Sequence, residues 1–158
     1  MDYFDITPNG MHHLHTEIER LKAARPALIA RVAAAAALGD RSENAEYTES
    51  KRELRHLESQ MRYMDKQTRY GEVVTPVDDD EATLGKTVEL LFDDDEEPET
   101  YQLVGPAEAD FAPNNLTSAS PLGQAILHHH VGDSCTVAAP NGEYVVKLVA
   151  VRLTPGML

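Results

Sequence analysis

Apolar residues recur at heptad spacing over two long stretches in the first half of the chain. The first stretch predicts a helix whose apolar face is made by Leu14, Ile18, Leu21, Leu28, Val32 and Ala35. The second predicts a helix that ends near Arg69, with an apolar face made by Tyr47, Leu54, Leu57, Met61 and Met64. Because the connection between them is short, the two helices are expected to be antiparallel neighbours in a long hairpin.

Local signals bound these two helices. Thr7-Pro8 is typical of a helix start, because the hydroxyl accepts a free backbone N–H and proline needs no donor at the first position. Gly39 suits the left-handed conformation that ends many helices. Pro26 lies inside the first pattern and is expected to kink the helix or split it near Ala24–Arg25.

The second half of the chain changes to the shorter period of strands. The stretch Tyr70–Ala82 contains Pro76 and four consecutive acids, and is expected to be a linker too polar and charged to pack. Strands are predicted at Thr87–Phe92, Glu99–Val104, Ser134–Ala138 and Glu143–Leu153, with a loop at Asn114–Ser120 and a short helix at Leu122–His128.

The predicted fold class is therefore α+β. We expect an N-terminal antiparallel coiled-coil finger at residues 1–75, a linker at 76–84, and a small antiparallel β domain with one short helix at 85–158.

Charge divides the chain in the same way. Residues 1–75 hold 12 acidic and 11 basic residues, whereas residues 76–158 hold 15 and 3, which together give the net charge of −13. The acidic half is expected to repel nucleic acid and membrane surfaces, so only the first half could contact phosphates. Cys135 is expected to be a buried, inert thiol in a reducing cytosol. The start of the chain resembles no signal segment and no run is long enough to span a membrane, so a soluble cytoplasmic protein is expected.

Three acids, Asp40, Glu43 and Glu46, lie at the junction of the two helical patterns. One interpretation is a capping box, in which Asp40 caps the second helix and Glu43 reaches back to its N–H. The other is a metal site that a partner completes, because Mg²⁺ prefers oxygen ligands and is often held by only one or two carboxylates. The residues alone leave both interpretations open.

Several motifs resemble a known family in its own order and spacing, from about Ile6 to Leu153. They are Thr7-Pro8-Asn9-Gly10, Arg25-Pro26, Gly39-Asp40-Arg41-Ser42-Glu43-Asn44-Ala45-Glu46-Tyr47 and Ser120-Pro121-Leu122-Gly123. They are similar to those of the bacterial Gre transcript-cleavage factors, and Arg41-Ser42 resembles the GreB form of the tip more than the GreA form.

The resemblance implies a concrete activity. The finger would enter the secondary channel of a backtracked RNA polymerase, where Asp40 and Glu43 would help hold a second Mg²⁺ and its attacking water. Glu46 matches the family position too and is a candidate for an additional tip acid. The polymerase would then hydrolyse its own extruded RNA, so the chain would not be an enzyme and would hold no Mg²⁺ stably alone.

The resemblance also implies how the second domain acts. It would have a fold like that of the FKBP prolyl isomerases and would dock on the rim of the channel through a surface that includes Ser120 and Pro121. A monomer is expected, with RNA polymerase and the extruded 3′ end of the nascent RNA as partners.

Basic residues follow the second helix. Arg52 and Arg55 lie on one face and are candidates for contacts with RNA phosphates, as in the family's basic patch. The alternative is a solvated face whose charges pair with Glu53, Glu58 and Asp65.

Two features depart from the family pattern. The run His128-His129-His130 is interpreted as a solvated helix end rather than a metal tract. The acidic loop Asp93–Glu97 has no assigned role.

Other functions remain open at this point. A Gre-like protein that binds in the secondary channel and inhibits polymerase is the main alternative. A prolyl isomerase is disfavoured because fold alone does not carry function, and a purely structural coiled coil is disfavoured because its tip would need only a turn.

Overall fold

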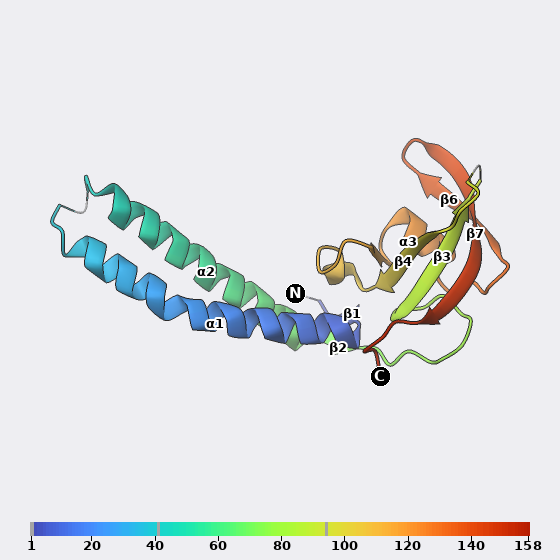
Figure 1. Ribbon diagram of the computed structural model, residues 1–158, viewed down its shortest axis with the longest axis horizontal. Coiled ribbons are helices and arrows are strands. Elements are labelled where there is room, and N and C mark those ends of the chain that lie inside the picture. The colour runs from blue at the N-terminus through green and yellow to red at the C-terminus, as the bar shows by residue number, and fades with distance from the viewer. Residues whose placement is uncertain (1, 41, 94) are drawn as a thin grey trace. The chain divides into compact units, whose positions relative to one another are not determined.

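The computed structural model describes residues 2–40, 42–93 and 95–158, and the chain folds into two compact units (Figure 1). Residues 13–70 form the first unit, and residues 2–12 together with 71–158 form the second. We expected the N-terminal residues to belong to the helical domain at 1–75, whereas residues 2–12 are part of the second unit. Arg41 of the predicted tip and Asp94 of the predicted acidic loop lie outside the described residues, as does Met1.

The first unit is a hairpin of two helices, as predicted. Helix α1 spans Pro8–Ala36 and helix α2 spans Ala45–Tyr70 (Figure 1). Ion pairs join Arg25 to Glu58 and Arg31 to Glu53, so residue numbers rise along α1 as they fall along α2. This order confirms that the helices run antiparallel.

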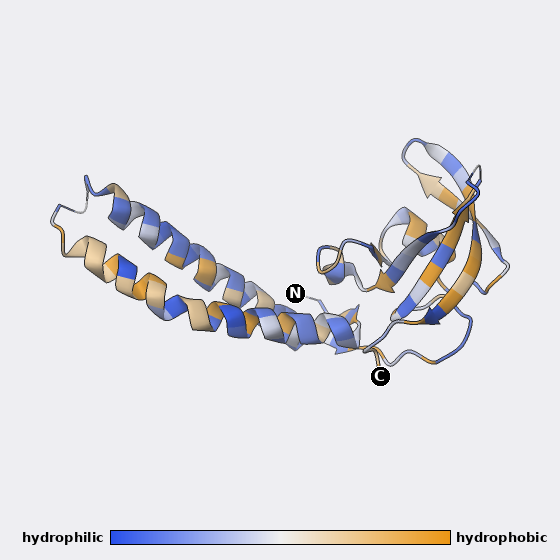
Figure 2. Ribbon diagram, in the orientation of Figure 1, coloured by the Kyte–Doolittle hydropathy of each residue, from blue (hydrophilic) through white to orange (hydrophobic). Residues whose placement is uncertain are grey.

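The predicted apolar faces form the seam of this hairpin. Leu21, Ala35 and Leu57 are buried, whereas Figure 2 shows that most of α2 is hydrophilic. The expectation that Pro26 splits the first helix is wrong, because α1 continues through it. Pro26 is exposed, whereas Leu21 before it and Leu28 after it are buried and half-buried. Their packing keeps the helix continuous although proline lacks the N–H for one helical hydrogen bond.

The second unit is built on a five-stranded sheet in the order β5-β4-β3-β7-β6. Its strands are β3 (Lys86–Phe92), β4 (Glu99–Val104), β5 (Asn115–Thr117), β6 (Ser134–Ala139) and β7 (Gly142–Leu153). All neighbours are antiparallel except β4 and β5, which are parallel. The four predicted strands are confirmed, but β5 lies in a stretch expected to be a loop.

A short helix packs against this sheet. Helix α3 (Pro121–Ile126) ends two residues before the prediction, because Leu127 is extended and His128 has a φ of 68°. The core beneath it is aliphatic and fully buried, and it includes Val88, Leu90 and Ile126. Val88, Glu89 and Leu90 of β3 alternate between the buried core and a half-buried position, whereas Lys86 and Thr87 at the start of the strand are buried as well.

A second, two-stranded sheet was not predicted. Strand β1 (Phe4–Ile6) pairs in parallel with β2 (Gly71–Val73), so segments far apart in the sequence lie side by side. Three residues are too few to show a strand period, and the pairing partner is distant in sequence.

Glu108, at the end of the 3₁₀-helix Pro106–Glu108, fixes the N-terminal segment within the second unit. Its carboxylate is 1% exposed and accepts hydrogen bonds from the backbone N–H groups of Thr7 at 2.9 Å and Gly105 at 2.8 Å, and from the Thr7 hydroxyl. The Thr7 hydroxyl in turn accepts from the N–H of Gly10 at 3.0 Å, which confirms the predicted cap of α1.

The acidic stretch expected to be an unpacked linker is instead held on the second unit. Lys86 is fully buried, and its Nζ donates to Asp79 Oδ1 at 2.5 Å and to the Glu81 carbonyl at 3.0 Å. The prediction failed because it considered the negative charge of Asp78–Glu81 alone and did not identify Lys86 as a buried cation. A buried lysine needs acceptors for its charged amino group, and the acidic stretch supplies them. None of the described helices combines the length and the hydropathy that crossing a membrane requires.

Candidate functional site

The predicted tip is the loop between α1 and α2 (Figure 1). Gly39 has a φ of 123°, which glycine adopts readily, and so the chain turns out of α1 as predicted. Asp40 and Glu43 both lie in this loop and are exposed. The structure therefore places them before the first turn of α2, not on it.

Asp40 is organised by its neighbour. One carboxylate oxygen, Oδ1, accepts both the Ser42 hydroxyl at 2.8 Å and the Ser42 backbone N–H at 3.0 Å. These two hydrogen bonds, the side-chain one first, hold the pKa of Asp40 below its ordinary value. Asp40 is therefore ionised at neutral pH, and its second oxygen is not used by Ser42.

The cap of α2 is Asn44, so the predicted capping box of Asp40 and Glu43 is wrong. The Asn44 Oδ1 atom accepts from the N–H of Tyr47 at 3.0 Å, which is the geometry of an N-cap. Its Nδ2 atom donates to the carbonyl of Ala35 at 2.8 Å, which is a free C-terminal group of α1. Asn caps as well as Asp, and Asn44 directly precedes the helix, whereas Asp40 lies four residues further back.

Glu46 is not free at the tip. It lies in the first turn of α2, and its Oε1 atom accepts from Arg31 Nε of α1 at 2.7 Å. The same guanidinium binds Glu53 through two nitrogens, at 2.7 and 3.3 Å. The sequence analysis named Glu46 as a candidate acid, but it did not identify Arg31 as its partner or Asn44 as the cap. The signal for Arg31 was its positive charge, on the part of the first predicted helix that precedes the three acids.

The candidate RNA contacts Arg52 and Arg55 lie near the start of α2. A hollow of about 370 Å³ is lined by Tyr47, Thr48, Lys51, Arg52 and Arg55. Lys51 Nζ lies 5.4 Å from the centre of the Tyr47 ring, and Arg52 pairs with Glu49 at 3.2 Å. Cations and one aromatic ring thus share a single surface.

The alternative for this basic face invoked pairing with Glu53, Glu58 and Asp65. Glu53 pairs with Arg31 and Glu58 with Arg25, so both acids are bound to cations of α1. Asp65 pairs with Arg69, one turn further along α2. These three acids therefore do not neutralise the cations that line the hollow.

The docking candidates begin α3. The Ser120 hydroxyl accepts from the N–H of Gly123 at 3.1 Å and donates to the Thr117 carbonyl at 2.8 Å, so it has a structural role as the helix cap. Pro121 follows as the exposed first residue of the helix. A shallow hollow of about 200 Å³ beside it is lined by Pro121, Gln124, Ala125, Thr136 and Ala138.

The histidine run follows α3, and its side chains contact the acidic stretch Asp78–Glu81. His130 Nδ1 lies 2.9 Å from Asp80 Oδ1, and His129 Nδ1 lies 3.1 Å from Asp133 Oδ2. The hydrogen bond to Asp80 raises the pKa of His130 above its ordinary value. In residues 2–40, 42–93 and 95–158 no three His, Cys, Asp or Glu side chains are grouped as a metal site.

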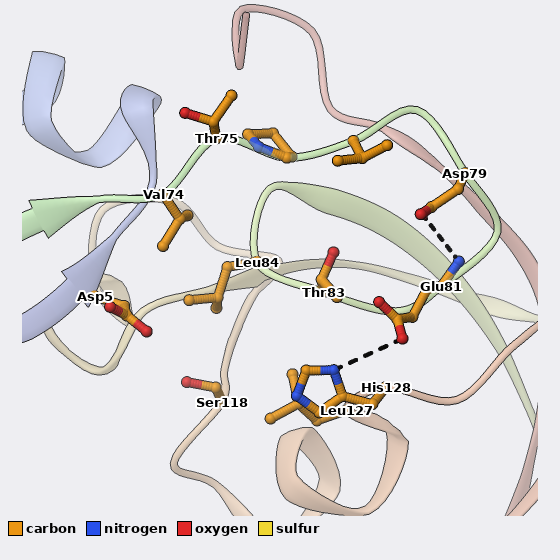
Figure 3. A pocket seen from close by; sticks show the side chains of 12 residues that line it. Asp5, Val74, Thr75, Asp79, Glu81, Thr83, Leu84, Ser118, Leu127 and His128 are labelled. Atoms are coloured by element: carbon orange, nitrogen blue, oxygen red, sulfur yellow. Dashed lines mark hydrogen bonds and ion pairs between the residues drawn. The ribbon is translucent and has the colours of Figure 1, made fainter.

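A cavity of about 330 Å³ lies on the second unit (Figure 3). Val74 and Leu84 line one part of it, and Glu81 lies 3.9 Å from His128 at another part. None of the predicted site residues lines this cavity. Cys135, the single cysteine, is 2% exposed as predicted, and burial raises the pKa of its thiol.

Comparisons with known proteins cover almost the whole chain. The family model described as "Transcription elongation factor, N-terminal" matches residues 4–73, and "Transcription elongation factor, GreA/GreB, C-term" matches residues 77–153. Transcription elongation factor GreA 1 of Lactiplantibacillus plantarum is 50% identical over 147 residues, which are 93% of this chain and 94% of that protein. Transcription elongation factor GreA of Rhodospirillum rubrum is 36% identical over 155 residues, which are 96% and 99% of the two chains.

Among solved structures, the GreA factor homolog 1 (Gfh1) protein of Thermus thermophilus is similar over 96% of this chain and 99% of that one, with 23% identity and a TM-score of 0.44. The relatives from Lactiplantibacillus plantarum and Rhodospirillum rubrum are both named GreA, and the predicted likeness of the tip to the GreB form is not confirmed. The two family matches and the two GreA relatives agree over both units, and so this chain belongs to the GreA/GreB family of transcription elongation factors.

Proposed function

We propose that this chain is a transcript-cleavage factor, which brings the loop of its helical hairpin to the active site of a backtracked RNA polymerase through the secondary channel. The observation that carries the proposal is the tip itself. Asp40 and Glu43 are exposed carboxylates in the loop between two helices, and Asn44 performs the capping that would otherwise occupy them.

The donor chemistry of the tip fits Mg²⁺. Carboxylate oxygens are the hard ligands that this ion prefers, and it is commonly held by one or two of them together with water and partner oxygens. Asp40 is held ionised by Ser42 through one oxygen, which leaves the other oxygen for a cation. The remaining ligands would come from the polymerase.

When bound there, Mg²⁺ would lower the pKa of a bound water and stabilise charge in the hydrolysis of the RNA backbone. Asp40 and Glu43 supply negative charge and orientation at that position. The bond is broken in the active site of the polymerase, so the chain acts as its cofactor and has no activity of its own.

The basic hollow on α2 supports a role in guiding RNA. Lys51, Arg52 and Arg55 can contact the phosphates of the extruded 3′ segment, and the Tyr47 ring lies among them. Contacts of this kind fix the position of the strand without reading its sequence.

Docking of the second unit on the rim of the channel is assigned to the hollow beside Pro121. Ser120 supports this surface by capping α3, and so a Ser120 variant would test the helix rather than the contact. Thr136→Glu places a charge in the hollow from an exposed strand position, and Thr100→Glu on β4 is the matched control. We expect only Thr136→Glu to weaken binding to polymerase; equal affinities would remove this assignment.

The cleavage function is tested on a stalled, backtracked elongation complex with matching polymerase and Mg²⁺. Wild type should accelerate cleavage of the 3′ RNA, and Asp40→Asn/Glu43→Gln should lose that stimulation while it still binds polymerase. The matched control is Glu17→Gln/Glu19→Gln, which removes the same charge from α1. Binding with slower nucleotide addition and no cleavage by wild type would instead establish the inhibitory alternative.

A further inference from the structure

Arg31 of α1 binds two glutamates of α2 at once. Its Nε lies 2.7 Å from Glu46 Oε1, while Nη1 and Nη2 lie 2.7 and 3.3 Å from the two oxygens of Glu53. Glu46 and Glu53 are seven residues apart, so they share one face of α2. The planar guanidinium suits such a double contact, because its donors point in fixed directions.

The bound state of Glu46 separates it from the other two tip acids. Glu46 is the acid of the first turn of α2, whereas Asp40 and Glu43 lie in the loop before the helix. The hydrogen bonds that Arg31 donates to Glu53 and then to Glu46 raise its pKa, so the guanidinium keeps its charge at any working pH. A carboxylate paired with a permanent cation is a poor ligand for a second cation.

A second contact fixes the same turn of α2. Asn44 donates to the Ala35 carbonyl, and Ala35 lies one turn after Arg31 on α1. Ala35 and Ser50 are both buried, and these small side chains allow the two helices to approach closely. The start of α2 is thus attached to α1 by Arg31 and by Asn44.

We propose that Arg31 is a positioning residue for the tip. By holding Glu46 against α1 it leaves Asp40 and Glu43 as the two metal-binding carboxylates, and it fixes the turn of α2 at which their loop ends. The inference rests on the proposed cleavage function and deepens it, because it defines which acids serve the metal and which one serves the scaffold.

The first test is the Mg²⁺ dependence of stimulated cleavage. Glu46→Gln and Arg31→Met should each lower the rate at saturating Mg²⁺ by about twofold to fivefold, the range for one exposed ion pair. The Mg²⁺ concentration at half-maximal rate should stay within about twofold of wild type, whereas Glu43→Gln should raise it about tenfold or more. The double variant Arg31→Met/Glu46→Gln should be no slower than the slower single variant, because Arg31→Met already removes the contact that Glu46→Gln removes.

The matched control is Arg25→Met, which removes the other arginine contact between the helices, a 3.2 Å pair with Glu58 further from the tip. It should leave the cleavage rate and its Mg²⁺ dependence unchanged. If Glu46→Gln raises the half-maximal Mg²⁺ concentration as Glu43→Gln does, Glu46 is a ligand and the proposal is overturned. Multiplied effects in the double variant would overturn it equally.

A second measurement needs no polymerase and separates this inference from the proposed function. Amide hydrogen exchange of residues 45–50 in the full chain should be faster in Arg31→Met and Glu46→Gln by similar factors, and unchanged in Arg25→Met. If wild type fails to stimulate cleavage, the proposed function fails, and exchange alone then decides whether Arg31 positions the turn. Unchanged exchange in Arg31→Met would refute the positioning role whatever the cleavage result.

Discussion

Asn44→Ala should loosen the start of α2. The substitution removes the cap acceptor of the Tyr47 N–H and the donor to the Ala35 carbonyl together. Loss of an Asn cap costs about 1 kcal/mol, and loss of a partly buried hydrogen bond costs about 1 kcal/mol more. We therefore expect the first turn of α2 to lose about 2 kcal/mol of local stability.

Such a loss corresponds to about a 30-fold rise in the equilibrium constant for opening that turn. Only one end of the hairpin is affected, so the melting temperature of the chain is an insensitive measure. The suitable assay is native-state amide exchange followed by NMR at Tyr47 and Thr48, whose N–H groups bond to the side chain and the carbonyl of Asn44. Exchange there should be about 30-fold faster in Asn44→Ala, and that of Leu57 should be unchanged.

Asn44→Asp separates the two contributions, because a carboxylate still accepts the Tyr47 N–H but cannot donate to Ala35. Its exchange should rise by about fivefold, which corresponds to about 1 kcal/mol. An effect as large as that of Asn44→Ala would show that the cap contributes nothing. A change of less than about threefold in Asn44→Ala would refute the reasoning on both contacts.

Three further predictions concern the second unit. Glu108→Gln should lower the free energy of unfolding by about 2–3 kcal/mol in urea, because an amide cannot accept every donor around the buried carboxylate, Thr7 included; an unchanged midpoint would contradict this. His130 has a raised pKa through Asp80, so its stabilisation is present below about pH 6.5 and is lost as pH rises through the folded value. His130→Gln should accordingly lower the melting temperature more at about pH 6 than at about pH 8.5, and a pH-independent effect would refute the assignment. Gly123→Ala should lower stability by about 1–3 kcal/mol, because its Cβ would lie 1.9 Å from a backbone carbonyl; wild-type stability by calorimetry would show that α3 shifts freely.

The elements with many repeated positions could be predicted from the sequence. The heptads around Leu21 and Leu57 predicted both helices, and the short connection between them predicted their antiparallel order. The strands at Ser134–Ala138 and Glu143–Leu153 were equally clear, since these two β-rich runs are joined by Asn141-Gly142, a pair typical of a tight turn. In these segments local pattern and tertiary packing favour the same structure.

The elements that depend on one distant partner could not be predicted. The parallel pairing of β1 with β2 involves three residues on each side and a long separation in sequence. Asp79 seemed to be part of a solvated linker, and only the fold shows the buried Lys86 beside it. A single charge has no periodicity, so its partner is visible only when the chain is folded.

The same limit explains the tip. Asp40, Glu43 and Glu46 are spaced three residues apart, and nothing in the sequence distinguishes the acid that pairs with a cation of α1 from the two that stay in the loop. The fold separates them by assigning the structural tasks to other groups: Asn44 caps α2, and Arg31 pairs with Glu46. The cap supplied by Asn44 therefore leaves Asp40 and Glu43 as exposed carboxylates in the loop before α2, which is what the proposed metal role would require. Asp at position 44 could cap α2 as well, but it could not donate to the Ala35 carbonyl, so the neutral amide makes a contact between the two helices that a carboxylate cannot make.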